Sequence, residues 1–433
     1  MPGIPQLPKF DVAALVLRDP YRFISRQAKT LKTDVFEARL LLNKTIFMTG
    51  EEAARVFTDK NLFTRKSAVP EPLRATLFGK GGIQGLDGES HFHRKELFMS
   101  LLSSDTIQEL QSSMTEWLKI YSERWENQNE VILYPEFQEI LTRTICSWAG
   151  VELPENQVQK RSRDLSMLYD SAGSPRDHLI VRAARKRSEI WISQMIEDIR
   201  SGERKDLHGT PLALFATFRD NDGKLLSSHS AAVDLLSIMR PTIAVSVFFL
   251  FVVHALHLDS DSRRRIRIHE AGFLDDFVNE VRRFYPFFPF VAARVKQDFR
   301  WGKLDFKRGR RVLLDLYGIN HDERIWERPY EFNPDRFKTA KISPYNFVSQ
   351  GVGDHQVDHR CPGEFLAIEL MRGLTEFFVH HISYDVPAQA LQINFNRLPA
   401  IPESQLRITN VQFSPPFFRP NIITESGVSK LWE

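Results

Sequence analysis

Apolar residues recur at helical spacing over most of the chain, and β-rich composition is confined to a few short runs. Residues 106–150 and 160–200 have apolar positions three and four apart, which is the pattern of amphipathic helices. Nearer the N-terminus, residues 34–40 and 44–49 favour strands, and the three residues between them indicate a hairpin. A short helix is predicted next, over residues 51–57. The pattern therefore predicts a mainly α fold, with a large helical domain and a small β-rich region.

A long helix is predicted near the middle of the chain, from about residue 229 to residue 257. A turn at residues 222–223 precedes it, and Ser227 or Ser228 can cap its first turn. The apolar run 242–253 within it is shorter than the ~20 residues that a membrane span needs. We therefore expect a buried central helix rather than a transmembrane one.

Composition and charge limit the classes of protein that the chain can represent. The 433 residues are 42% hydrophobic and contain no linker or repeat, so we expect one domain spanning residues 1–433. The net charge is +3 and the basic residues are dispersed, which argues against nucleic-acid binding. Two cysteines give no disulfide framework. Residues 1–8 have neither the charged nor the apolar region of a targeting segment, so we expect a cytoplasmic protein without a membrane anchor.

Cys361 lies in the segment HRCPGE, residues 359–364, directly before an apolar segment of helical period. Backbone N–H groups at a helix N-terminus, with the positive end of the helix dipole, stabilise sulfur as the anion that binds a metal. The alternative is a small buried residue at a loop-to-helix junction. The other cysteine, Cys146, lies within an apolar helix and is expected to be core.

Two further features accompany this cysteine. Glu280 and Arg283 stand one helical turn apart, where a carboxylate and a guanidinium can pair, and Arg336 can close a triad. Each feature alone is typical of a solvated surface pair. In this order and spacing, and with the loop from Phe347 to the cysteine, the chain resembles a cytochrome P-450 over nearly its whole length. The resemblance implies the cytochrome P-450 fold in a single heme-thiolate domain, with heme b as cofactor and the Cys361 thiolate as axial ligand of the iron, which favours O–O cleavage.

Side chains that would bind the heme propionates are expected at the start of a helix. Residues 78–88 contain five glycines, a density that lets backbone approach a ligand, although no phosphate-binding glycine spacing is present. His91 has Arg94 and Lys95 three and four positions on, so the three share a face of the following helix. A solvated basic face is the alternative. His91 and Lys95 also resemble the H-x-x-x-K pair of the superfamily's propionate-binding helix. The resemblance implies Arg65 as a further residue that binds a heme propionate.

The central helix carries Arg240-Pro241 where the superfamily has an acid followed by an alcohol that deliver protons at the distal face of the heme. Neither register of this sequence supplies an acid. A buried guanidinium is costly unless an anion meets it, and the nearest upstream acid, Asp234, is more than one helical turn away. A substrate carboxylate would satisfy Arg240 bidentately, and Pro241 would kink the helix beside the iron. Pairing of Arg240 with a distant carboxylate is the alternative.

Arg240-Pro241 in this helix marks a narrower group, and the chain resembles the bacterial fatty-acid peroxygenases. The match extends to Phe78-Gly79 and to residues 83–88, 280–286, 313–318 and 359–364. Phe347 precedes the cysteine by fourteen residues, about twice the usual separation, as is characteristic of that group. Residues 351–353 differ from the glycine triplet often found there.

The resemblance implies a peroxygenase that hydroxylates long-chain fatty acids at the α or β carbon, uses hydrogen peroxide and needs no obligate redox partner. Arg240 would hold the substrate carboxylate, which would serve as the general acid and base that the protein lacks. Phe78, Phe287, Phe290 and Val291 would line the channel for the tail, although phenylalanine at such spacing is more often core.

Gln84 bears on the product. In that group the equivalent position is Gln in hydroxylases and His in a decarboxylase that forms terminal alkenes, and a neutral amide cannot donate a proton as an imidazole can. Hydroxylation is therefore favoured, with Arg240, Pro241 and Gln84 as the predicted catalytic residues. The alternatives are a peroxide-driven decarboxylase, a reductase-dependent monooxygenase and a non-catalytic heme protein.

Overall fold

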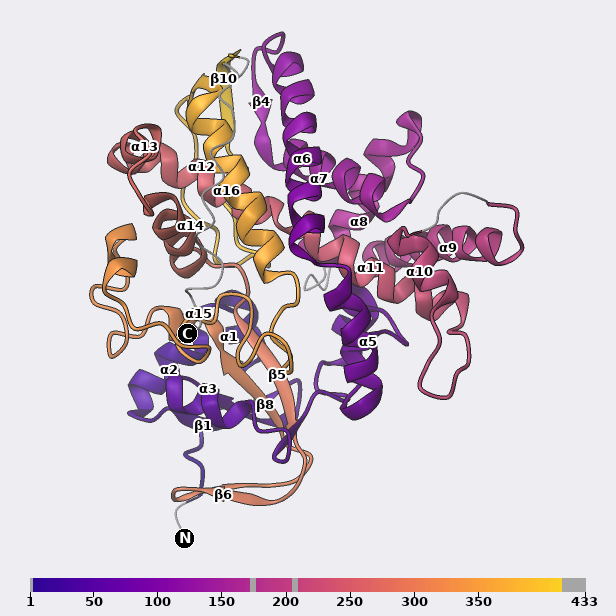
Figure 1. Cartoon of the computed structure of the whole chain (residues 1–433). Helices are drawn as coiled ribbons and strands as arrows, with labels where there is room; N and C mark the ends of the chain where they lie inside the picture. The colour runs from indigo at the N-terminus through magenta and orange to yellow at the C-terminus, as the bar shows by residue number, and fades with distance from the viewer. Residues whose placement is uncertain (1–2, 172–176, 205–208, 415–433) are drawn as a thin grey trace.

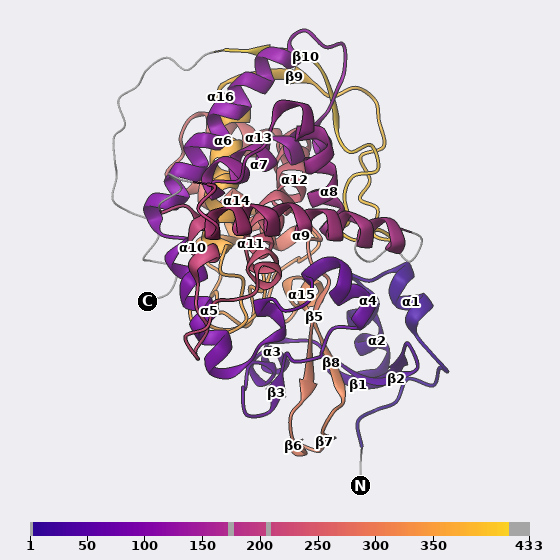
Figure 2. The ribbon, with the colours of Figure 1, turned by 90° about the vertical axis from the view of Figure 1, so that its right-hand side faces the viewer.

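Most of the chain folds into helices that pack on one another, while the strands of the largest sheet gather at the opposite end of the molecule (Figure 1). The computed structural model describes residues 3–171, 177–204 and 209–414. Figure 2 shows the same separation from the side, with β5 and β8 below the helices and the β6–β7 hairpin projecting beyond them. The predicted mainly α fold with a small β-rich region is confirmed.

The α-helices of the described residues are α1 (Ala13–Arg18), α2 (Phe23–Leu31), α3 (Glu51–Phe57), α4 (Glu71–Leu73), α5 (Gly88–Ser100), α6 (Ser104–Trp125), α7 (Leu133–Ala149), α8 (Val158–Asp170), α9 (His178–Arg200), α10 (Pro211–Thr217), α11 (Ser228–Ala244), α12 (Ser246–Leu258), α13 (Ser260–Arg267), α14 (Phe273–Phe284), α15 (Leu316–Asn320) and α16 (Glu364–His380). The shorter helical turns are η1 (Arg74–Phe78), η2 (Ile83–Gly85), η3 (Glu155–Gln157) and η4 (Pro334–Lys338). The strands are β1 (Val35–Leu40), β2 (Asn43–Met48), β3 (Phe63–Thr64), β4 (Val131–Ile132), β5 (Phe290–Val295), β6 (Phe299–Trp301), β7 (Leu304–Phe306), β8 (Arg311–Asp315), β9 (Ile382–Asp385) and β10 (Arg407–Phe413).

The predicted hairpin is the β1–β2 pair, which is antiparallel with Leu40 opposite Asn43. Leu41 and Leu42 at its turn both have positive φ, 52° and 62°. Two central residues of this kind match the right-handed twist of the strands. The short helix predicted after the hairpin is α3, as expected.

The largest sheet has the strand order β1-β2-β8-β5-β3, with β2 and β8 parallel and the other pairs antiparallel. Side chains alternate along each strand, so its two faces bury separate apolar clusters. Leu313 packs in one cluster with Phe23 and Phe36, near the N-terminus. Leu314 packs in the other with Val348, from the loop that precedes the cysteine. The sheet therefore supports the cysteine loop from one face only.

The predicted central helix runs through the helical core as α11 and α12. The Ser227 hydroxyl caps it by accepting a hydrogen bond from the Ser230 N–H at 3.1 Å. The predicted helix is confirmed; its two segments meet at a single turn residue, Val245, which keeps helical dihedrals and lies four residues after Pro241, the residue expected to kink the helix. Ser228–Leu258 is long and apolar enough to cross a membrane, but 94% of its most apolar window is buried inside the protein. The prediction of a buried core helix is confirmed.

The predicted triad forms at the end of α14. Glu280 and Arg283 are fully buried and pair at 2.7 Å, and the Arg336 Nε lies 3.1 Å from the Glu280 carboxylate. Arg283 also donates to the backbone carbonyls of Asn320 and Pro329 at 2.8 and 2.9 Å. Because each charge has an opposite partner and further hydrogen bonds, the triad ties α14 to the chain that leads to the cysteine loop.

Candidate active site

Cys361 lies at the end of a long loop, immediately before α16. Its backbone N–H donates to the Gln350 carbonyl at 3.2 Å, which folds the loop back on itself. Burial raises the pKa of the Cys361 thiol to about 11, while the Gly363 N–H and the cations Arg240 and Arg360 favour the thiolate. A thiol with this pKa keeps its proton at neutral pH until a metal displaces it. The cysteine is thus suited to a resident metal rather than to a free nucleophile.

The surroundings of Cys361 fit an iron that is carried in a macrocycle. Within the residues that the structure describes, no group of three or more His, Cys, Asp or Glu side chains can hold a bare metal ion. An iron at Cys361 therefore needs its other ligands from elsewhere, as heme provides. Cys146 is enclosed in the helical core, where burial raises its pKa to about 12.

The predicted propionate residues His91 and Lys95 both reach the cysteine loop from α5. The His91 ring lies 4.3 Å from that of His359, and the Lys95 Nζ donates to the His355 carbonyl at 2.9 Å. Burial lowers the pKa of His91 to about 4, so its imidazole offers an N–H rather than a charge at neutral pH. Their role at a propionate stays a prediction.

Arg65 directly follows strand β3 and lies near the cysteine loop. Its Nη1 donates to the Ala292 carbonyl at 2.7 Å, and the guanidinium lies over the Phe57 ring at 4.5 Å. Burial lowers the pKa of Arg65 to about 10, and the Asp87 charge, which also faces His359 at 3.7 Å, opposes that effect. The structure thus brings Arg65 close to the histidines of the cysteine loop.

Arg94 is oriented differently from its two neighbours on α5. Its Nη1 lies 2.9 Å from the Asp234 carboxylate and 2.9 Å from the Gly81 carbonyl. Asp234 belongs to α11, so Arg94 links α5 to the central helix instead of joining His91 and Lys95. The sequence placed all three on one helical face but could not show which neighbour each would meet.

Arg240 lies on α11 with 6% of its surface exposed, and its Nε has no hydrogen-bond partner. In the described part of the chain it forms no ion pair, and its guanidinium carbon lies 5.7 Å from the centre of the Phe78 ring. Burial lowers the pKa of Arg240 to about 9, Arg185 lowers it further, and Cys361 opposes the effect, so the guanidinium shares one interior with the thiol. The distant carboxylate that was the alternative partner is not found among these residues.

Contacts that the sequence did not predict hold the glycine-rich segment, residues 78–88, against α11. The Asp234 carboxylate accepts the Ile83 N–H at 2.8 Å in addition to Arg94. The Ser237 hydroxyl donates to the Val233 carbonyl at 2.8 Å and lies 3.3 Å from the Gln84 side-chain oxygen. Burial raises the pKa of Asp234 to about 6. The signal in the sequence is the spacing of Asp234, Ser237 and Arg240, each three residues and therefore nearly one helical turn after the one before.

The alcohol after Pro241 does not replace the missing proton relay. The Thr242 hydroxyl donates to the Ile238 carbonyl at 3.0 Å, within its own helix. Pro241 itself is half-buried inside α11. Neither residue supplies an acid, as the sequence predicted.

The residues predicted to line a tail channel fall into two groups. The Arg185 Nη2 donates to the Phe78 carbonyl at 2.9 Å, and Phe287 stacks on Phe248 of α12 at 4.2 Å, so both belong to the helical core that contains α11. Phe290 and Val291 are neighbours on β5 and pack in the clusters on opposite faces of the sheet. One strand cannot present both to the same channel at these positions, but their predicted contact with substrate is otherwise untested.

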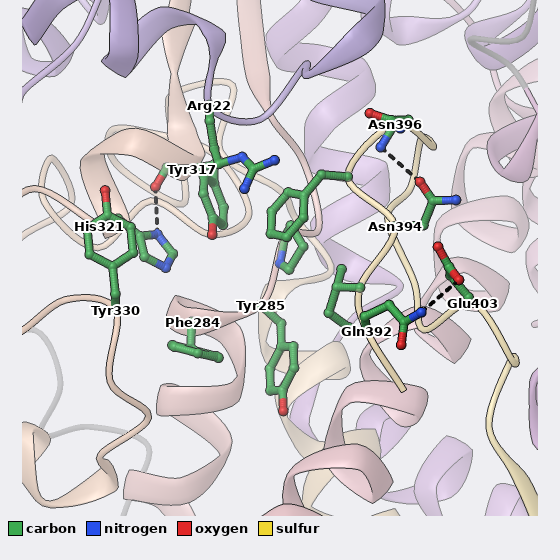
Figure 3. Close-up of a pocket in the computed structure, with 13 residues that line it drawn as sticks. Arg22, Phe284, Tyr285, Tyr317, His321, Tyr330, Gln392, Asn394, Asn396 and Glu403 are labelled. Atoms are coloured by element: carbon green, nitrogen blue, oxygen red, sulfur yellow. Dashed lines mark hydrogen bonds between the residues drawn. The ribbon is translucent and has the colours of Figure 1, made fainter. Parts of the chain in front are cut away.

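A pocket of about 550 Å³ opens elsewhere, at the C-terminal end of α14 (Figure 3). It contains none of the predicted site residues. Some of its polar groups are bonded to one another: Gln392 donates to Glu403 at 3.0 Å, and the His321 Nδ1 lies 2.9 Å from the Tyr317 carbonyl. The lining contains no cysteine, so this pocket is separate from the proposed heme site.

Comparisons with known proteins agree with this geometry. A family model described as Cytochrome P450 matches residues 267–405. The solved structure of a point mutant of cytochrome P450SP alpha (CYP152B1) is 43% identical, with a TM-score of 0.90, and the match covers 93% of this chain and 99% of that one. The chain belongs to the cytochrome P450 family. The predicted P-450 fold and the narrower resemblance to fatty-acid peroxygenases are both confirmed.

Two further P450 structures are similar over their whole length. Cytochrome P450EX alpha (CYP152N1) with myristic acid is 42% identical, with a TM-score of 0.91, covering 96% of this chain and 100% of that one. A point mutant of cytochrome P450 OleT in complex with arachidonic acid is 32% identical, with a TM-score of 0.92, covering 95% and 100%. Putative cytochrome P450 137 of Mycobacterium tuberculosis is 24% identical over 64% of this chain, which spans only 63% of that relative. As a P450, the chain is an oxidoreductase that binds heme with a thiolate ligand, and Cys361 is the cysteine placed to supply it.

Proposed function

We propose that this P450 hydroxylates long-chain fatty acids at the α or β carbon and uses hydrogen peroxide as the oxidant. The observation that carries the proposal is Arg240, a buried guanidinium without an ion-pair partner in the described chain, close enough to Cys361 for the two groups to interact electrostatically. A carboxylate is the anion that matches a guanidinium fork. Two of the similar structures hold myristic or arachidonic acid, which supports a fatty acid as its source.

The protein residues then fix the geometry of the reaction. Arg240 would hold the carboxylate, and Cys361 would hold the heme, so the α and β carbons beside the head group are the ones proposed to react. The thiolate-ligated heme supplies the oxidising chemistry when it is bound. Since Pro241 and Thr242 provide no acid, the substrate carboxylate takes a proton from peroxide and returns it to the departing oxygen, which leaves as water. One C–H bond of the fatty acid becomes C–OH.

The absence of a protein proton relay supports peroxide, rather than a reductase and dioxygen, as the source of oxidising equivalents. On this basis we propose that the enzyme needs no dedicated redox partner. The long apolar helix α11–α12 is buried in the core, which supports the expectation of a cytoplasmic enzyme without a membrane anchor in the described chain.

Decarboxylation to a terminal alkene is the second candidate, and Gln84 favours hydroxylation over it. The Gln84 side-chain oxygen lies 3.3 Å from the Ser237 hydroxyl, so its amide group is next to α11. A neutral amide does not deliver a proton as an imidazole does.

The test is to incubate the purified heme-loaded enzyme with myristic acid and hydrogen peroxide and to identify the products by mass spectrometry. We expect 2- and 3-hydroxymyristic acid. A parallel reaction with NAD(P)H, a ferredoxin and its reductase distinguishes the alternative: products there, with none from peroxide, would establish a reductase-dependent monooxygenase. A fatty-acid-induced heme absorbance change without product in either reaction would indicate a non-catalytic heme protein.

A further inference from the structure

A strongly basic pocket lies where the chain leaves the β6–β7 hairpin and enters β8, at the strand end of the molecule (Figure 2). It has a volume of about 300 Å³. Six basic side chains line it, together with an asparagine and a glycine: Lys44, Arg294, Lys307, Arg308, Arg310 and Arg311. No acidic side chain belongs to the lining, so the pocket has a large excess of positive charge.

Two of these arginines lie directly opposite each other. Arg294 on β5 and Arg311 on β8 are partners in the antiparallel ladder, a position where like charges destabilise a sheet. The Arg294 guanidinium donates only to carbonyls, of Ser67 at 2.6 Å and Gly309 at 2.8 Å. The Arg311 Nε likewise donates to the Ala68 carbonyl at 3.1 Å. Among the described residues neither arginine has a carboxylate partner.

Arg311 is the innermost of the group. Only 6% of its surface is exposed, and its Nη1 has no hydrogen-bond partner. Burial lowers the pKa of Arg311, and the adjacent Arg294 lowers it further. An arginine in this position is costly without an anion.

The carboxylates near the pocket are already shared among the other cations. Glu37 lies 3.9 Å from the Lys44 Nζ and 3.7 Å from Arg310. Asp298 lies 3.0 Å from the Lys307 Nζ. In the part of the chain that the structure describes, no carboxylate lies within ion-pair distance of the Arg294, Arg308 or Arg311 guanidinium, although Asp298 also interacts electrostatically with Arg308. The three arginines line a single pocket.

We propose that this pocket binds a phosphate group, carried by a soluble phosphorylated molecule or by a lipid head group. Three arginines without a contact ion pair among the described residues match an anion of more than one charge, and the planar guanidinium fork binds phosphate oxygens bidentately. A fatty carboxylate carries one charge and leaves most of the cations unmatched.

The site is separate from the proposed fatty-acid reaction. Arg311 and Leu313 are two residues apart on β8, so their side chains lie on the same face of the sheet. Leu313 packs with the N-terminal cluster, whereas Leu314, on the other face, packs with the cysteine loop. Phosphate binding can therefore be tested without reference to catalysis.

The first experiment is isothermal titration of the full-length heme-loaded protein with sodium pyrophosphate at constant ionic strength. Arg308→Gln is the test variant, because Arg308 is exposed and its side chain makes no hydrogen bond to the residues that the structure describes, so folding should be unaffected. Arg300→Gln is the matched control, since Arg300 is 57% exposed on β6 and lies outside the pocket. We expect saturable binding that weakens at least tenfold in Arg308→Gln and stays within twofold of wild type in Arg300→Gln.

The second experiment is cosedimentation with phosphatidylcholine vesicles that contain or lack phosphatidic acid. Pyrophosphate binding that Arg308→Gln weakens supports a soluble phosphorylated ligand. Binding only to phosphatidic-acid vesicles, lost in the same variant, supports a lipid head group. The proposal is overturned if neither probe binds saturably, or if Arg308→Gln and Arg300→Gln weaken binding equally, which would indicate diffuse surface charge.

Discussion

Replacing Arg240 with leucine removes a buried charge that no described side chain neutralises. Burial lowers the pKa of Arg240 from 12.5 to about 9, which corresponds to a cost of about 5 kcal/mol for keeping the guanidinium charged in the folded protein. Because the folded-state pKa is the lower one, this cost is present in full below pH 9 and is relieved only as the pH rises toward 12.5. Without fatty acid, Arg240→Leu should therefore have a free energy of unfolding equal to or above that of wild type, whereas most core substitutions destabilise.

The same substitution should have the opposite effect on fatty-acid binding. A hydrogen bond to a charged group contributes about 1.5–3 kcal/mol, so loss of a bidentate pair should weaken binding by at least about 3 kcal/mol, or roughly 150-fold. The assay is titration of the heme absorbance with myristic acid, with myristyl alcohol as a ligand of equal chain length and no carboxylate. Alcohol affinity should differ little between wild type and variant.

Arg185→Leu is the matched control for the stability measurement. Arg185 is 2% exposed but pairs with Glu189 at 2.6 Å, so its removal leaves that carboxylate with only His229, at 3.9 Å, and should lower the free energy of unfolding by about 3 kcal/mol. The reasoning is refuted if Arg240→Leu is destabilised as much as Arg185→Leu. It is refuted equally if the variant binds myristic acid within threefold of wild type.

Three further predictions follow from single residues. Gln84→His should shift the products of the peroxide reaction from hydroxy acids toward terminal alkene, because imidazole can donate a proton. Gas chromatography measures the ratio of the two products, and Gln84→Met is the control variant without a proton donor. Equal ratios in wild type and both variants would contradict the role of Gln84. Burial raises the pKa of Asp315, the N-cap of α15, from 3.8 to about 7. The cost of burying its charge therefore lowers the free energy of unfolding by its full amount above pH 7, and this cost disappears below pH 4, where the carboxyl is protonated in both states. Asp315→Asn should therefore raise Tm at pH 8 and leave it unchanged at pH 4, and a lower Tm at pH 8 would count against this reasoning. Arg336→Leu should lower the free energy of unfolding in urea by about 3–5 kcal/mol, because it breaks a buried pair with Glu280. Arg328→Leu, whose ion pair with Glu331 is exposed, should lower it by less than about 1 kcal/mol, and similar losses in both variants would argue against the triad as a stabilising unit.

The features that the sequence predicted correctly depend on short-range periodicity or on a recognised order of motifs. Glu280 and Arg283 pair because three residues span nearly one helical turn, and the β1–β2 hairpin forms because its turn separates two β-rich runs. The buried central helix follows from an apolar run bounded by polar residues. In each case the interaction partner lies within the pattern itself or within the family motif.

The features that the sequence could not predict depend on which distant surfaces meet. Arg94 and Asp234 are 140 residues apart, and nothing in their local sequence indicates that α5 and α11 touch at that point. Phe290 and Val291 were assigned to one channel, but adjacent residues on a strand face opposite sides. That alternation was available from the sequence, whereas the tertiary contact of Arg94 was not.

The contacts that Asp234 and Ser237 of α11 make with Ile83 and Gln84 also determine how the proposed reaction site can be altered. Asp234, Ser237 and Arg240 are spaced along a rigid helix that rises about 1.5 Å per residue, so the contact to Ile83 and the head-group cation are separated axially by about 9 Å. On the proposed role of Arg240, the position of Gln84 relative to the substrate head group is set by α11 and not by the glycines beside Gln84. We therefore expect that a different oxidation position requires moving residues along α11, since lengthening the glycine-rich segment would leave this spacing unchanged.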